Sequence, residues 1–209
     1  MTTQNAVTEL GHYTWSVLRD VLAEKKRKMP PLYFFLSPES QGSLRNRTPA
    51  EKDFVHSQQF SDGGACLKDP AAAWVSRLNQ VPEEAGHLFA LSYKKDRLPT
   101  QCSIAEELWT TCLHECFGRF AECLVLGLPE KKTQARQTSI RTRTQIWNAA
   151  HREGYRLGEA LAELYFMESL SLANFRSLFF RPWVGEKVAH LSLQKLYSMS
   201  RMKAPDFGL

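Results

Sequence analysis

The stretch SIAEELWTTCLHECFGRFAECLVLGLP, residues 103–129, decides the fold because it carries the start, body and stop signals of one long helix. Ser103 and Glu106 have the spacing of a capping box, in which each side chain accepts a hydrogen bond from the other residue's backbone. Gly127 and Pro129 mark the end, since glycine commonly closes helices and proline cannot continue them. The sequence therefore predicts a helix over about 104–126.

A second long helix is predicted over about 140–168. Its seam alternates steps of three and four residues, as packing against another helix requires. The seam residues are Arg143, Trp147, Ala150, Gly154, Leu157, Leu161 and Leu164. Shorter helices are expected around Phe175 and over about 186–202, so the C-terminal half reads as a helical bundle.

Small residues recur at every fourth position of the second helix, at Ala150, Gly154, Gly158 and Ala162. Two glycines inside a helix cost about 1 kcal/mol each relative to alanine, so another backbone is expected to approach closely there. The interpretation favoured over a subunit contact is packing on the helix at 104–126.

The N-terminal half combines a helix over about 5–27 with two short runs rich in aromatic residues, LYFFLS (32–37) and HLFALSY (87–93). Their length and composition are typical of buried strands, and they are expected to pair in one sheet. Two helix starts, at Thr48-Pro49 and Asp69-Pro70, lie between them.

The predicted fold class is therefore α+β, mostly α. A small N-terminal sheet with helices and polar loops, residues 1–99, is expected to pack on a C-terminal helical bundle with a basic face, residues 100–209.

Composition indicates an ordinary globular protein, with 209 residues, 43% of them hydrophobic and 23% charged. No apolar run approaches the roughly 18 residues of a membrane span, and the N-terminus lacks the basic and apolar regions of a secretory signal. We expect a cytoplasmic protein with no membrane partner. The odd count of five cysteines favours reduced thiols.

Positive charge is concentrated in the last part of the chain. Residues 131–209 carry 13 lysines and arginines against 6 acids, a net charge of +7, whereas residues 1–130 carry 14 against 16, a net charge of −2. Such asymmetry favours a polyanionic partner.

The basic segment at 131–156 is predicted to divide into two parts. Lys132 and Arg136 would lie on the apolar side of a longer helix, which the core would not accept, so the helix is expected to start near Ser139 and to leave Lys131, Lys132 and Arg136 in a flexible arm. Arg141, Arg152 and Arg156 share the outer face of the helix, and Arg143 lies near its first turn. Arginine matches phosphate in a two-pronged geometry, so phosphate contacts are expected. The full set of predicted nucleic-acid contacts is Lys131, Lys132, Arg136, Arg141, Arg143, Gln145, Asn148, Arg152, Arg156, Arg176 and Arg181.

Catalytic and metal-binding motifs are incomplete. Cys112, Cys116 and Cys123 lack the paired spacing of a zinc site and are interpreted as buried small hydrophobes. His114-Glu115 begins like a zinc-protease HExxH motif, but Gly118 stands where the second histidine belongs. No catalytic residue, cofactor or metal ligand is predicted, although scattered histidines leave a general base open.

The function expected is non-catalytic binding of DNA or RNA as one subunit of a larger nucleoprotein assembly, for example a CRISPR effector-type complex of a plasmid or phage. A protein-interaction adaptor is the alternative, and a metal-dependent hydrolase or nuclease is the third possibility.

Overall fold

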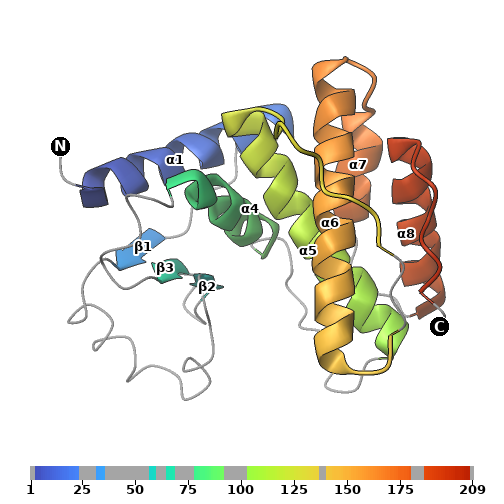
Figure 1. Ribbon diagram of the computed structural model, residues 1–209. Helices are drawn as coiled ribbons and strands as arrows, with labels where there is room; N and C mark the ends of the chain where they lie inside the picture. The colour runs from blue at the N-terminus through green and yellow to red at the C-terminus, as the bar shows by residue number, and fades with distance from the viewer. Residues whose placement is uncertain are drawn as a thin grey trace.

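The computed structural model describes residues 3–23, 32–35, 57–59, 65–68, 78–91, 103–136, 140–179 and 186–207. Most of this part of the chain is helical (Figure 1). The helices are α1 (Thr3–Val21), the short 3-10 turn η2 (Leu78–Gln80), α4 (Val81–Leu91), α5 (Ile104–Leu126), α6 (Arg143–Phe166), α7 (Leu172–Phe179) and α8 (Glu186–Ser200).

The predicted α+β fold, with a sheet packed on the bundle, is wrong, and the described body of the protein is a helical bundle. The second expected strand, HLFALSY, lies in α4 as far as Leu91. Every residue from Val81 to Ala90 is buried, and the predicted strand has no polar residue between His87 and Ser92, so the segment by itself shows no helical period. Glu83 and Glu84 occupy the first turn, where the helix dipole favours acids.

Three short strands lie beside α1 and α4: β1 (Leu32–Phe35), β2 (Ser57–Gln59) and β3 (Ala65–Lys68). β1 pairs parallel to β3, and β2 pairs antiparallel to the other edge of β3. With three or four residues each, they are at the short limit for strands and contribute no layer comparable to the helices.

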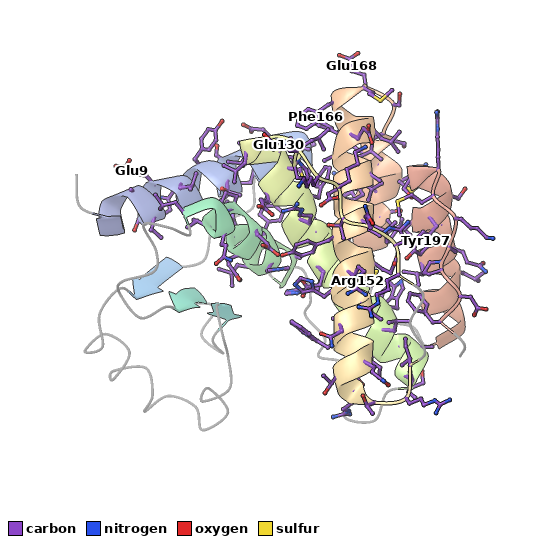
Figure 2. All side chains as sticks on the ribbon, in the orientation of Figure 1. Glu9, Glu130, Arg152, Phe166, Glu168 and Tyr197 are labelled. Atoms are coloured by element: carbon purple, nitrogen blue, oxygen red, sulfur yellow. The ribbon has the colours of Figure 1, made fainter. Side chains whose placement is uncertain are left out.

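Helices α5 and α6 run parallel to each other, side by side. Arg143 of α6 lies against Glu107 of α5, and Glu159 lies further along against Arg119. The chain therefore has to return along the bundle after α5 before α6 begins. Residues 127–136, here called the return segment, start this return beside Glu163 and Glu159 of α6. Figure 2 accordingly shows Glu130, just after α5, at the same end of the bundle as Phe166, the last residue of α6.

The glycines of α6 explain how closely the two helices approach, and the predicted internal contact is confirmed. A Cβ atom on Gly158 would lie 2.6 Å from the carbonyl oxygen of Cys116, and one on Gly154 would lie 2.7 Å from that of Cys112. Real Cβ atoms essentially never come so near, so the missing side chains let the backbones touch. The small-residue ridge is therefore covered by α5.

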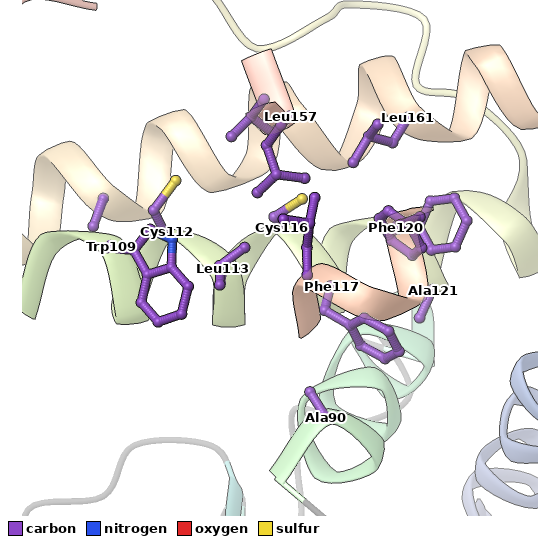
Figure 3. Close-up of a cluster of buried hydrophobic side chains, with 14 of the residues drawn as sticks. Ala90, Trp109, Cys112, Leu113, Cys116, Phe117, Phe120, Ala121, Leu157 and Leu161 are labelled. Carbon is purple, nitrogen blue, oxygen red and sulfur yellow. The ribbon is translucent and has the colours of Figure 1, made fainter. Parts of the chain in front are cut away.

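One hydrophobic cluster joins the helices around α5. Figure 3 shows Leu157 and Leu161 of α6 facing α5, with Phe117 of α5 lying near Ala90 of α4. The rings of Phe117 and Phe89 stack with centroids 5.9 Å apart. The cluster contains residues from both sides of residue 100, and the division into parts 1–99 and 100–209 stays a prediction.

Helix boundaries agree with the sequence where capping residues fix them. The capping box of Ser103 and Glu106 is present, and α5 ends at Leu126 as predicted. In contrast, α1 ends at Val21 rather than near residue 27, and Ala23 already has a positive φ of 55°. Thr142 caps α6, which therefore begins at Arg143 and not near residue 140. The helix starts expected at Thr48 and Asp69 lie outside the described residues.

Candidate functional site

The return segment is held against α6 and is not the free arm that the sequence predicts. Thr133 donates hydrogen bonds from its backbone nitrogen and its hydroxyl to the carboxylate of Glu159, at 2.8 and 2.9 Å. Lys132 forms an exposed ion pair with Glu163. Lys131 and Arg136 are exposed on either side of this attachment. Residues 131–136 therefore present cations from a fixed position.

Arg141 and Arg143 lie at the exposed start of α6. The Arg143 side chain is 84% exposed, with Nε 3.6 Å from an oxygen of Glu107. The side-chain oxygen of Gln145 already has a hydrogen-bond partner, because it accepts a hydrogen bond of 2.7 Å from the Arg141 backbone nitrogen. Asn148 is exposed on the next turn. Two arginines and one amide therefore remain at this end of the predicted surface.

Arg152 and Arg156 do not behave alike, although the sequence places both on the solvent face. Arg152 is partly exposed, whereas the Arg156 side chain is only 16% exposed and forms an ion pair with Glu153. Glu153 also accepts a hydrogen bond of 3.1 Å from the Tyr197 hydroxyl of α8. Arg156 therefore balances a buried carboxylate between α6 and α8. Figure 2 shows Tyr197 of α8, the other partner of this carboxylate.

Arg176 and Arg181, the last two predicted contacts, are only in part described by the structure. Arg176 of α7 is exposed, and its Nη1 donates a hydrogen bond of 3.2 Å to the Leu22 carbonyl oxygen. Phe175 of the same helix is fully buried and belongs to the core. Arg181 lies outside the described residues.

Trp147 is on the surface, and the predicted seam is wrong at this position. Its side chain is 54% exposed, whereas Ile146 and Ala149 are buried in its place. The indole begins a stripe along α6 in which Trp147 and His151 have ring centroids 5.0 Å apart and His151 stacks on Tyr155 at 4.3 Å. The i, i+4 spacing places these rings one above the other. The stripe leads from an exposed indole to buried polar groups.

A cluster of histidines and glutamates lies where α4, α5 and α6 meet. Nε2 of His87 is 3.7 Å from oxygens of both Glu83 and Glu115, and Nε2 of His151 is 3.6 Å from Glu115. The His87 and His114 rings stack with centroids 4.1 Å apart. Each of these helices thus supplies ionisable groups to one place.

Burial and neighbouring charges shift the pKa values of this cluster in opposite directions. Burial lowers the pKa of His87, but Glu83 and Glu115 outweigh it and raise the pKa to about 9. Burial raises the pKa of Glu115, yet the three surrounding histidines leave it lowered. The pKa of Glu83 is lowered in the same way by His87 and by the Tyr155 hydroxyl, which donates a hydrogen bond to Glu83.

Arg119 organises a second polar group beside this cluster. It donates hydrogen bonds of 3.0 and 2.8 Å to Glu159, pairs with Glu122 and lies over the Tyr155 ring at 4.9 Å from the centroid. Glu159 is thereby fully occupied, since its carboxylate also receives both hydrogen bonds from Thr133. This group links α5, α6 and the return segment.

The cysteines of α5 are buried free thiols, as the sequence predicts. Burial raises the pKa of all three thiols, that of Cys123 to about 12. Among the described residues, none of the groups with metal-ligand spacing includes a cysteine. Thiolate chemistry at neutral pH is therefore disfavoured at Cys112, Cys116 and Cys123.

No protein family, curated protein or solved structure matches the chain. In the part of the chain that the structure describes, none of the helices has the length and apolar character to cross a membrane.

Sequence reasoning missed Glu83, Tyr155 and Glu159 as members of polar groups. Glu83 and His87 have i, i+4 spacing, which would bring them together on a helix, but the segment containing His87 reads as a strand. Tyr155 and His151 repeat the same spacing after Trp147. The spacing of Tyr155 is informative within the helix predicted over 140–168, whereas that of Glu83 is informative only if residues 81–91 are helical.

Proposed function

We propose that this chain binds nucleic acid without catalysis, through the first turns of α6, and that unpaired bases stack on Trp147. The observation that carries the proposal is the exposure of this indole between Arg143 and Asn148. Aromatic side chains beside cations are the usual platform for unpaired bases, since every base has a face that stacks and a phosphate nearby.

The charges around Trp147 support this proposal. Residues 143–152 contain no acid, Arg141 precedes them, and the one acid described beside Arg143 is Glu107 of α5, whose oxygen lies 3.6 Å from Nε and leaves the arginine 84% exposed. Cations at a helix N-terminus oppose the dipole at a cost of about 0.3–1 kcal/mol each, so helix stability does not account for them. An anionic ligand would reverse that cost by binding the arginines and the positive end of the helix together.

The rigidity of the indole also favours this role. Trp147 rests against His151, which in turn stacks on the half-buried Tyr155. A platform that is already ordered loses less conformational entropy when a base stacks on it.

The positive face is small, because Arg156 and Lys132 are neutralised by acids. We therefore propose that the chain acts as one subunit of a larger nucleoprotein assembly, for which a CRISPR effector-type complex is one setting. The alternative function, a protein-interaction adaptor, is less well supported. The small-residue ridge that could have contacted a partner protein is covered by α5.

Replacing Trp147 with alanine is expected to weaken binding of a fluorescent single-stranded oligonucleotide about five- to a hundredfold, as the loss of one stacked base implies. Stability should change by no more than about 0.5 kcal/mol, because the side chain is exposed. Fluorescence anisotropy and urea unfolding measure the two effects. Tyr13→Ala provides the matched control, because Tyr13 is a 59% exposed aromatic residue on α1. Equal affinities of the two variants would argue against the platform.

Reversing two charges near Trp147, with Arg141→Glu and Arg143→Glu together, is expected to abolish detectable binding at moderate salt. For the unchanged protein, the logarithm of the binding constant should fall against the logarithm of salt concentration with a slope of about −0.7 per phosphate contacted. A double variant with Lys195→Glu and Lys203→Glu changes the net charge equally at exposed positions in and after α8. If both double variants lose binding alike, net charge and not this surface governs the affinity.

A further inference from the structure

We infer that Glu83, Glu115 and His151 form a binding site for a divalent transition-metal ion, with Zn²⁺ as the natural probe. One ligand atom from each of the three residues lies within 4.8 Å of the other two. The three residues come from three helices, α4, α5 and α6, so a bound ion would connect them. The site shares His151 with the support of Trp147 on the proposed nucleic-acid surface, but the contacts that carry this inference are those with Glu83 and Glu115.

The charges of the site require compensation. The side chains of Glu83 and Glu115 are only 12% and 10% exposed. Burying carboxylates is costly unless a positive group accompanies them. Nearby Glu159 and Glu153 have arginine partners, Arg119 and Arg156. Among the residues that the structure describes, the ionic partners of Glu83 and Glu115 are histidines, and a single charged histidine between two carboxylates leaves one negative charge to balance.

His87 has the hydrogen bond expected of a metal-binding histidine. Its Nδ1 donates to the His114 carbonyl oxygen at 3.1 Å, which leaves Nε2 directed at Glu83 and Glu115. Histidine ligands commonly donate their other ring nitrogen to a backbone carbonyl in this way, which fixes the ring and its tautomer. His87 can therefore serve as a fourth ligand or as the group that orients the two carboxylates.

The separations suit an ion better than direct hydrogen bonds. The nitrogen-to-oxygen distances of 3.6 and 3.7 Å exceed the usual limit of about 3.2 Å for a hydrogen bond. Two ligands bound to one tetrahedral zinc, at about 2.0–2.2 Å each, lie about 3.3–3.6 Å apart. Small side-chain adjustments would close the site on an ion.

The donor set indicates the class of metal. Imidazole nitrogen combined with carboxylate oxygen suits zinc and neighbouring first-row ions, whereas magnesium and calcium prefer oxygen alone. His151 is the most exposed of the three ligands, with 34% of its side chain accessible, and gives the ion a route from solvent. Three protein ligands would leave a coordination position for water or substrate.

The test uses the untagged full chain, stripped with a chelator and titrated with ZnCl₂ by calorimetry. We expect about one Zn²⁺ per chain and a higher melting temperature on binding, because an ion that binds only the folded state stabilises it. His151→Ala and Glu115→Gln should each weaken zinc binding at least about tenfold. Loss of a residue that only hydrogen-bonds to a ligand already costs about that much, and loss of a ligand should cost more. His151→Ala should fold normally because the side chain is partly exposed.

His12→Ala serves as the control, since His12 is an exposed histidine on α1. Its zinc affinity should equal that of the unchanged protein. Co²⁺ provides a second readout, because its visible absorption should appear in the control and disappear in His151→Ala. The inference is overturned if the unchanged protein binds no zinc, or if His151→Ala and Glu115→Gln both bind it as tightly as the control. Either result would assign the balancing charge to a protonated His87.

Discussion

Gly158→Leu is expected to cost about 3–5 kcal/mol and to leave the helical bundle largely unfolded. The first added carbon alone would lie 2.6 Å from the Cys116 carbonyl oxygen and 2.9 Å from the Phe120 nitrogen. These are backbone atoms of α5, so no rotation of a side chain relieves the contact and the helices must separate. Circular dichroism during urea unfolding measures the loss.

A leucine introduced at an exposed position is the control for the effect of close packing. Ser198→Leu places the same side chain at an exposed position of α8 and should alter stability by less than about 0.5 kcal/mol. Sizing chromatography adds a second criterion. A Gly158→Leu protein that stays folded but changes its oligomeric state would show that the small-residue ridge serves a subunit contact instead.

Glu159→Ala is expected to destabilise the protein by about 3–5 kcal/mol, the usual cost of breaking a buried ion pair from one side. Glu159 is 2% exposed and accepts hydrogen bonds from Arg119 and from two groups of Thr133. Its removal would leave the Arg119 guanidinium with Glu122 alone and would release the return segment. Chemical denaturation followed by tryptophan fluorescence gives the change in free energy.

Glu163→Ala is the control, one turn further along the same helix. Glu163 pairs with Lys132, but the two side chains are 41% and 54% exposed, and exposed pairs contribute about 0–1 kcal/mol. The two alanine variants should therefore differ by at least about 2 kcal/mol. A difference near zero would mean that solvent weakens the ion pairs of Arg119 with Glu159 and Glu122 far more than the burial of these side chains indicates.

The parts of the fold that the sequence predicts are those with local signals. The bounds of α5 follow from Ser103, Glu106 and Gly127, each of which acts on its own backbone. The close approach at Gly158 follows from the spacing of small residues along one helix. The helical state of residues 81–91 was missed because uniform burial hides the helical period.

The candidate site was less predictable, because long-range pairing determines which charges stay available. Arg156 faces outward by helical geometry alone, but Glu153 and Tyr197 hold it between α6 and α8. Trp147 fits an apolar seam by period, yet Ile146 takes the buried position beside it. Which neighbour covers a given face of a helix depends on how the helices are arranged, and single-helix periodicity does not contain that information.

The parallel course of α5 and α6 affects how the chain reaches its native state. In an antiparallel pair, contacts near the connecting turn form early because their residues are close in sequence. Here the contacts across the pair join residues far apart, as with Arg119 and Glu159, separated by 40 positions. Because distant contacts require larger loops to close first, folding slows as their share rises. Assembly of this helix pair therefore has to wait for the connection between α5 and α6 to return along the bundle, and this helical protein should fold more slowly than an up-and-down bundle of its size.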